Sequence, residues 1–246
     1  MWKFKYLLTI VFVSLNLVAK TQNTETDTWK TFNESSNRME GKLMGETYYI
    51  NALANSNYFL QKDWVDGTIR LTDDDVVTNV KLRYLSYNDE IVAYNDNIRT
   101  LFIVEKKTVK EFSFKVLLAN GSYKERKFIN LYSMDLPGGK SYFEVLYSGA
   151  VRLLVFHRIE KIKVSPFTDD TGIKRDTEYK PEKVYYILSD KTGLDRIQRR
   201  KASIIKMYPD NKKEIRKLFR KNKIKIFDDE TLIQAFQILD KEGILH

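Results

Sequence analysis

The sequence predicts a fold that is mainly β with some α: an antiparallel β-sandwich or open barrel followed by a small C-terminal helical appendage. Three observations support this prediction. From residue 64 to residue 164, short alternating or apolar runs are separated by turn residues, which is typical of antiparallel strands. Asn120-Gly121 joins two β-rich runs, where it favours a type I′ hairpin turn, because both central residues of that turn need positive φ. Beyond residue 198 the apolar period changes from 2 to 3.6, which indicates helices.

The first residues have the three parts of a secretory signal peptide. Lys3 and Lys5 form a positive start, residues 6–19 are almost entirely apolar, and a polar segment follows at once. The apolar run has 14 residues, fewer than the roughly 20 that a helix needs to cross a bilayer. We therefore expect a signal peptide over residues 1–21, an exported protein with no transmembrane segment after its removal, and a flexible polar lead-in over residues 22–47.

The antiparallel β-domain is expected over residues 48–198. Its last hairpin is turned at residues 189–193, and it is preceded by an exposed loop over residues 165–181, which contain Pro166, Gly172 and Pro181. The predicted strands are 66–72, 76–84, 90–94, 100–104, 111–118, 123–131, 142–147, 151–164, 183–188 and 194–198.

A basic helical tail is expected over residues 199–246. A short helix ends before Pro209, and Asp210 is the expected N-cap of the second helix, which Asn222 ends in the left-handed conformation. Asp228 or Asp229 is expected to cap the third. The apolar residues at helical spacing predict the side of each helix that packs into the core. They are Ala202, Ile204, Ile205, Ile215, Leu218, Phe219, Leu232, Ile233, Phe236 and Leu239.

Charge is concentrated in this tail. Residues 196–225 hold 13 Lys and Arg but only two acidic residues, a net charge of +11, and because the whole chain carries +9 the remainder is −2. Such a region can engage phosphates of lipid or nucleic acid, or an acidic protein. Export argues against nucleic acid, and no aromatic residues are interleaved for base stacking. The alternative is an ordinary solvated helix surface.

Several kinds of chemistry are excluded by composition. The chain has no cysteine, which removes disulfides, thiolate nucleophiles, Cys-ligated zinc and a lipoprotein anchor. Of the two histidines, His157 lies in an apolar strand, where we expect a hydrogen-bonded or solvated ring, and His246 is the last residue. No phosphate-binding glycine loop, dinucleotide fingerprint or nucleophile elbow is present. We expect no cofactor and no metal site.

Carboxylates offer the remaining route to catalysis. Residues 73–75 and 169–170 are acidic clusters without calcium-loop spacing, so we interpret them as solvated turns. Glu90, Glu144 and Glu160 lie on or beside strands and are eligible for a glycosidase pair. Glu144 is the first to check, because burial beside Phe143 would raise its pKa, but strand alternation predicts that it faces water.

Three segments carry a resemblance to a known family. They are residues 82–91 (LRYLSYNDEI), 142–154 (YFEVLYSGAVRLL) and 208–215 (YPDNKKEI) with the helices that follow. In order and spacing they resemble a family of exported, uncharacterised proteins of Bacteroidota bacteria, over roughly residues 64–240. The resemblance implies a β-rich domain with a short C-terminal helical tail, and it assigns no catalytic or binding residues.

The sequence thus favours a non-enzymatic exported module that binds or structurally supports a partner in the periplasm or at the outer membrane. One alternative is a carboxylate-dependent glycan hydrolase, and a further alternative is a protein that binds lipid or lipopolysaccharide in an apolar cavity. The partner is expected to be a protein or another envelope component, reached through the basic tail. The candidate contact residues are Arg199, Arg200, Lys212, Lys213, Arg216, Lys217, Arg220 and Lys221.

Overall fold

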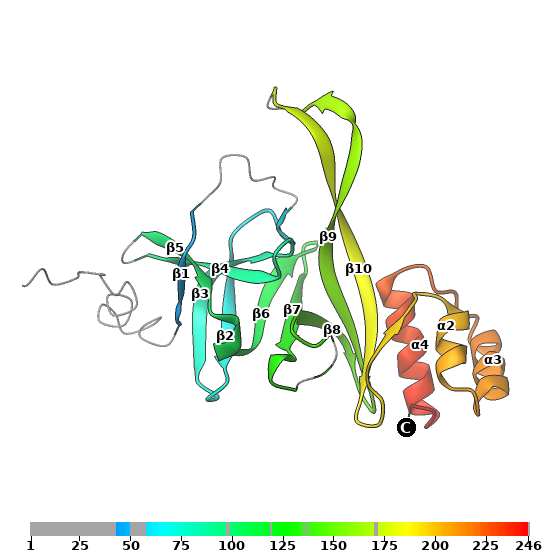
Figure 1. Cartoon of the computed structure of the whole chain (residues 1–246). Helices are drawn as coiled ribbons and strands as arrows, with labels where there is room; N and C mark the ends of the chain where they lie inside the picture. The colour runs from blue at the N-terminus through cyan, green and yellow to red at the C-terminus, as the bar shows by residue number, and fades with distance from the viewer. Residues whose placement is uncertain are drawn as a thin grey trace, which may run out of the picture.

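The computed structural model describes residues 43–49, 58–96, 99–118, 120–134, 136, 138–169 and 172–245. The expected signal peptide and most of the expected lead-in lie outside these residues. In the described part of the chain, eleven strands form one antiparallel sheet that does not close, and three helices follow it (Figure 1). The predicted mainly β fold with a C-terminal helical appendage is therefore confirmed, with a single open sheet in place of a sandwich.

The sheet has the strand order β1-β5-β4-β3-β2-β6-β7-β8-β9-β10-β11. The strands are β1 (Gly45–Thr47), β2 (Val65–Leu71), β3 (Val76–Leu85), β4 (Glu90–Asn95), β5 (Thr100–Val104), β6 (Val109–Leu117), β7 (Tyr123–Asn130), β8 (Tyr142–Ser148), β9 (Arg152–Thr168), β10 (Lys174–Ser189) and β11 (Gly193–Ile197). The helices are α2 (Lys201–Met207), α3 (Lys212–Lys221) and α4 (Asp229–Lys241). Strand β1 lies within the stretch expected as a lead-in, where its residues pair with β5.

Aromatic rings fill the core on the inner side of β2–β8. Phe112 stacks on Phe128 with ring centroids 4.6 Å apart, and the ring of Tyr142 meets Phe112 edge-on at 5.1 Å. Tyr84 also lies in this core, and all four residues are almost completely buried. Large side chains that alternate along strands bury the most apolar area, which explains why the aromatic-rich runs form the middle of the sheet.

Strands β9 and β10 continue beyond the sheet as a two-stranded ribbon, seen at the top of Figure 1. Strand β8 pairs with β9 only as far as Val155, and β11 pairs with β10 only from Tyr185 onward. Residues 156–169 and 172–184, which we call the arm, therefore pair only with each other in the described sheet. The loop predicted over residues 165–181 is therefore wrong, because most of it is strand. Both prolines are tolerated: Pro181 lies on an open strand edge, and Pro166 lies where the register shifts.

The base of the arm packs against the body through three tyrosines. Tyr58 stacks on Tyr87 with centroids 4.8 Å apart, and Tyr179 of β10 meets Tyr58 edge-on at the same distance. Burial and the hydrogen bond to Tyr179 raise the pKa of Tyr58 to about 12. An isolated two-stranded ribbon is only marginally stable in water, so this contact stabilises the part of the arm nearest the sheet.

The three helices pack on the last strands of the sheet, beside β10 and β11 in Figure 1. Their apolar faces share one core with β8–β11. The buried helical residues in that core are Ile204, Ile215, Leu218, Phe219, Leu232, Ala235, Phe236 and Leu239, which include most of the residues predicted from the helical period. The hydroxyl of Tyr147 in β8 also donates to Asp240 of α4.

Four predictions on turns and caps have different outcomes. Asp228 caps the third helix, α4, because its side chain accepts from the backbone N–H of Thr231 at 2.8 Å, so that cap is confirmed. The cap of α3 is Asn211 rather than Asp210. The left-handed residue that follows α3 is Lys223 rather than the predicted Asn222, whose φ is −89°. At the β6–β7 turn Gly121 has positive φ but Asn120 does not, so the predicted type I′ turn, which needs positive φ at both residues, is wrong.

Candidate functional site

The predicted contact residues of the tail lie mainly on α3. This helix buries Ile215, Leu218 and Phe219 against the sheet and α4, and the same period places its Lys and Arg side chains in solvent. We call these exposed residues the basic face. They are Lys212, Lys213, Arg216, Lys217, Arg220 and Lys221.

The basic face is not neutralised by the protein itself. None of its six residues forms an ion pair with another described residue, and Glu214 is the one acidic residue within α3. Arg199 and Arg200, in the link between β11 and α2, are also exposed. Arg199 alone among the eight predicted contacts has an acidic partner in the described part of the chain, Asp229 at 3.6 Å.

Asp229 joins the first turn of α4 to the edge of the sheet. Its carboxylate accepts from Lys183 Nζ at 2.6 Å and from the Tyr185 hydroxyl at 2.7 Å, and Arg199 donates to that hydroxyl at 3.3 Å. Burial opposes the ionisation of Asp229, but the hydrogen bonds from Lys183 and Tyr185 outweigh it and lower the pKa of Asp229. This ionic contact fixes the helices, and with them the basic face, relative to β10.

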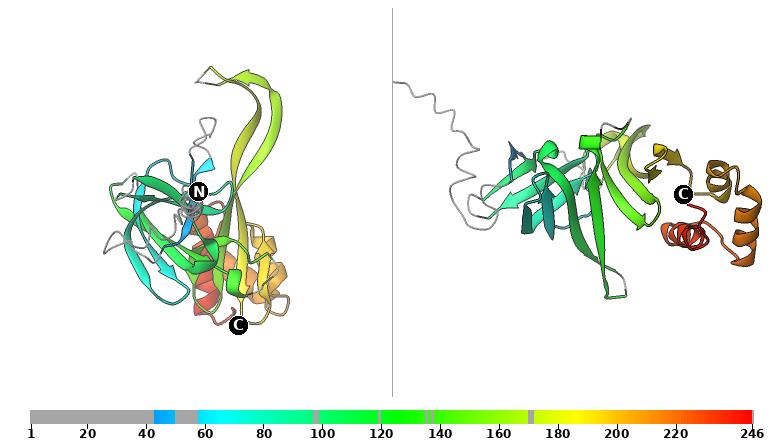
Figure 2. Two further views of the ribbon diagram at one scale, coloured as in Figure 1. Left: turned by 60° about the vertical axis from the view of Figure 1, so that its left-hand side comes forward. Right: turned by 90° about the horizontal axis from the view of Figure 1, so that it is seen from below.

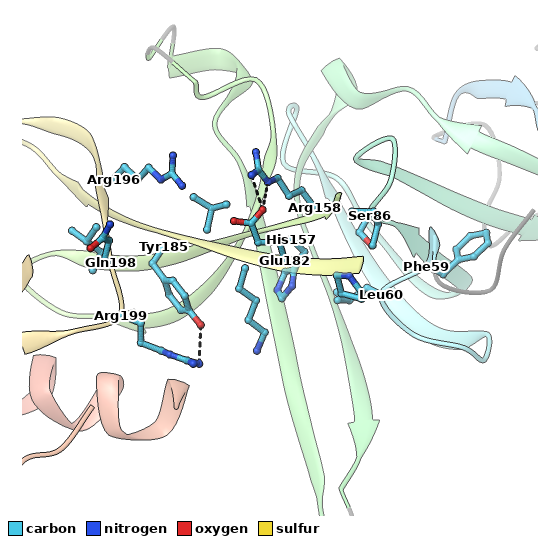
Figure 3. Close-up of a pocket in the computed structure, with 15 residues that line it drawn as sticks. Phe59, Leu60, Ser86, His157, Arg158, Glu182, Tyr185, Arg196, Gln198 and Arg199 are labelled. Carbon is cyan, nitrogen blue, oxygen red and sulfur yellow. Dashed lines mark hydrogen bonds and ion pairs between the residues drawn. The ribbon is translucent and has the colours of Figure 1, made fainter. Parts of the chain in front are cut away.

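A pocket of about 670 Å³ lies at the base of the arm, where β11 ends (Figure 3). Figure 3 shows Arg158 paired with Glu182 on one side of β10, and Tyr185 beside Arg199 on the other. Apolar residues also line the pocket, so it combines cations with an apolar wall. The apolar lining residues are Phe59, Leu60, Ile159, Pro181, Val184 and Ile197. A second hollow of about 1070 Å³ lies beside α2 and includes Arg200.

Glu144 is buried, with only 5% of its surface exposed, so the expectation that it faces water is wrong. Arg126 of β7 donates to both of its carboxylate oxygens, at 2.8 and 2.7 Å, and His157 Nε2 lies 2.6 Å from Oε2. Burial opposes ionisation, but these hydrogen bonds and the charge of Arg126 lower the pKa of Glu144 to about 2. A general acid needs the opposite shift, so Glu144 is a structural anion.

His157 is held in the same group, as the sequence predicted for a ring satisfied within a strand. It is 4% exposed, and burial lowers its pKa despite the neighbouring carboxylate of Glu144. The neutral ring therefore donates its Nε2–H to Glu144. Arg126, Glu144 and His157 come from three adjacent strands, β7, β8 and β9, and the ring of His157 lies 6.1 Å from that of Phe128 in the aromatic core.

The other carboxylates do not converge with Glu144 in the described structure. Glu160 is exposed on the arm and opposite Lys180, while Glu90 is half-buried on β4, where burial raises its pKa. The acidic clusters form turns: Asp74 pairs with Lys110 at 2.6 Å, and Asp169 accepts from the N–H of Ile173 at 2.9 Å. Asp170 lies outside the described residues. Within the described ranges, no three acidic or histidine side chains are placed to hold a metal ion.

One buried polar group was missed by sequence reasoning. Asp89, which lies between the strands predicted over residues 76–84 and 90–94, is 7% exposed and accepts from the Tyr84 hydroxyl at 2.5 Å and from Lys106 at 2.7 Å. Its carboxylate also accepts from the backbone N–H of Tyr142 at 3.2 Å. Burial raises the pKa of Asp89 in spite of Lys106. A turn sequence carries no signal for this role, because burial here depends on strands distant in the sequence.

Comparison with known proteins adds no assignment: no protein-family model, curated protein or solved structure matches this chain. The resemblance to exported Bacteroidota proteins remains a prediction. Among the helices of the described residues, none is both long enough and apolar enough to cross a bilayer.

Proposed function

We propose that this protein is a non-enzymatic binding module of the cell envelope, exported to the periplasm or the outer membrane, which contacts an anionic partner through the basic face. The observation that carries the proposal is a cluster of six exposed cations on one helix with no acidic partner among the described residues. Such a cluster of like charges creates a positive potential that attracts an external anion.

The rigid attachment of α3 supports this proposal. A flexible basic segment has to be ordered when it binds, which costs conformational entropy. Here the apolar side of α3 is already packed into the core, and the contacts of Asp229 join the helical unit to β10. The cations are therefore presented on a pre-organised surface.

The alternatives have less support. A glycan hydrolase needs two converging carboxylates, one with a raised pKa, whereas Glu144 is an ion-paired carboxylate with a pKa of about 2. A lipid carrier needs an apolar cavity, and the inner side of β2–β8 is packed with aromatic rings. Both pockets described above lie outside that core.

The test is binding to soluble polyanions, with polyphosphate and polyglutamate as probes of phosphate and carboxylate recognition. The variant Arg216→Glu, Arg220→Glu, Lys221→Glu reverses three exposed charges. At about 1 kcal/mol for each cation near an anionic surface, we expect a loss of affinity of roughly 100-fold or more at low salt. Binding by the wild-type protein should weaken steeply as salt rises.

A matched control separates the basic face from net charge. The variant Lys161→Glu, Lys163→Glu, Lys174→Glu changes three exposed residues of the arm and lowers the net charge from +9 to +3, as the α3 variant does. We expect this control to retain most of the affinity. Equal losses in both variants, or binding that is insensitive to salt, would contradict the proposed role of the basic face.

A further inference from the structure

The hairpin between β6 and β7 ends in an exposed apolar tip. Leu117 is 64% exposed, Leu118 39% and Tyr123 70%, and Leu117 lies directly opposite Tyr123 across the two strands. None of the three belongs to a hydrophobic core of the described structure. We call these three residues the β6–β7 tip. Large apolar side chains that gather on a surface mark an interaction site.

The tip extends away from the rest of the sheet. Strand β6 pairs with β2 only as far as Phe114, and β7 pairs with β8 only from Phe128 onward. Beyond these residues the hairpin is a two-stranded ribbon with two open edges. The right-hand view of Figure 2 shows this green hairpin projecting well beyond the remainder of the sheet. The apolar tip is thus able to reach a flat surface without a clash from the body.

Three backbone N–H groups of the turn have hydrogen-bond partners within it. The N–H of Leu118 donates to Ser122 O at 2.8 Å, and that of Gly121 donates to Leu118 O at 2.9 Å. The Asn120 side chain accepts from both the N–H and the hydroxyl of Ser122, at 3.0 and 2.7 Å. Removing backbone groups from water is costly unless they are hydrogen-bonded, and these bonds reduce that cost for the turn.

Cations lie directly behind the apolar tip. Lys115 and Lys124 are exposed, and neither forms an ion pair with a described residue. Lys115 lies directly opposite Glu125, the single acidic residue of the hairpin end, whereas Lys124 lies opposite Val116. Long lysine side chains can keep their ammonium groups at the level of lipid phosphates while shorter apolar residues lie deeper. An apolar end followed by lysines matches the order of layers in an anionic bilayer, from acyl chains to head groups.

We propose that the β6–β7 tip inserts shallowly into an anionic lipid bilayer. This inference rests on the proposed function, because it makes the lipid head groups the anionic partner of the basic face. Two separate signals, one apolar and one electrostatic, give membrane attachment that neither provides alone. The insertion is limited to the tip, since the open edges of the hairpin behind it carry unpaired backbone groups that need water.

The absence of cysteine allows a site-specific test. Leu117→Cys carries an environment-sensitive NBD label, and Lys191→Cys, in the exposed turn between β10 and β11, is the matched control. Each labelled protein is mixed with vesicles of phosphatidylcholine and phosphatidylglycerol, with and without nitroxide-labelled acyl chains. We expect a blue shift and quenching for the Leu117 position and neither for the Lys191 position.

A second variant tests the tip without a label. Leu117→Asn with Leu118→Asn removes apolar surface from exposed positions, so the fold should be retained. Its affinity for the same vesicles should fall by roughly tenfold or more, while its affinity for polyphosphate should be unchanged. A basic-face variant should instead lose affinity for both vesicles and polyphosphate.

The outcomes separate the two proposals. Polyphosphate binding without quenching of the tip label on bound vesicles would overturn insertion and leave the proposed function intact. Loss of salt-sensitive binding to every polyanion would overturn the proposed function itself. Self-association in the absence of vesicles that is abolished by the tip variant would also overturn insertion, because a second copy would then cover the tip.

Discussion

Replacement of Glu144 by Gln tests the buried polar group most directly. The pKa of Glu144 is about 2 against an ordinary value of 4.5, a difference of about 2.5 units. One unit corresponds to 1.36 kcal/mol, so the folded structure favours the ionised over the protonated carboxyl by about 3 kcal/mol. We therefore expect Glu144→Gln to lower the free energy of unfolding at pH 7 by about 3 kcal/mol.

We expect Arg126→Met to lower the free energy of unfolding at least as much as Glu144→Gln does. It leaves the carboxylate of Glu144 buried without its cation, and breaking a buried pair in this way costs about 3–5 kcal/mol. The double variant Arg126→Met, Glu144→Leu should cost less than the sum of the two, because it removes both charges at once. Urea unfolding followed by circular dichroism measures all three.

The buried group of Arg126, Glu144 and His157 also makes the stability of the protein depend on pH. A carboxyl whose pKa is lowered on folding stabilises the protein above pH 4.5, and this contribution is lost as the pH falls from 4.5 towards 2. Burial also lowers the pKa of His157, so stability should begin to decline as the pH falls below 6.5. In Glu144→Gln the decline between pH 4.5 and 2 should be shallower than in wild type. If Glu144→Gln lowered the free energy of unfolding at pH 7 by less than about 1 kcal/mol, this account of the ion pair would be refuted. The same conclusion would follow if the decline in stability between pH 4.5 and 2 were the same as in wild type.

Three further substitutions test local features. Asp228→Ala removes the cap that binds the N–H of Thr231, and should lower the free energy of unfolding by about 1 kcal/mol, with a lower melting temperature. Tyr179→Ala should accelerate hydrogen exchange in the arm while the amides of β2–β6 stay protected, and uniform acceleration would count against a local role. Gly67→Ala would place a Cβ 2.6 Å from Leu82 Cδ2, so we expect a loss of about 1–3 kcal/mol in urea unfolding; an unchanged unfolding midpoint would mean that the strand shifts to make room.

The sequence predicted the regular elements well where the signal was local. The strand predicted over residues 100–104 has the bounds of β5, and the three helices follow the apolar period closely. The strand predicted over residues 151–164 covers part of the arm, but its outer part was missed because Pro166, Gly172 and Pro181 normally interrupt strands. Pro181 is tolerated on an open strand edge and Pro166 where the register shifts. The cap of α3 moved by one residue, a shift that composition does not determine.

The candidate site was predicted in part. Clustered charge is visible in the sequence, so the residues of the basic face could be named, whereas their lack of acidic partners required the structure. The burial of Glu144 and of Asp89 was not predicted, because the local sequence around each residue carries no signal for it. Their burial arises from contacts with Arg126 and Lys106, 18 and 17 residues away in the chain, and alternation along one strand does not reveal such partners.

The strand order also bears on how the chain reaches its folded state. From β2 to β5 and from β6 to β11, each strand pairs with the next along the chain, so both meanders are able to grow by adding successive hairpins. Strands β2 and β6 join the two meanders through a long-range contact, in which Arg70 meets Glu111 across 41 residues. Closing that loop costs entropy before any pairing offsets it. We therefore expect the β2–β6 junction to form late and to limit the folding rate, with the C-terminal meander and its helices already able to assemble.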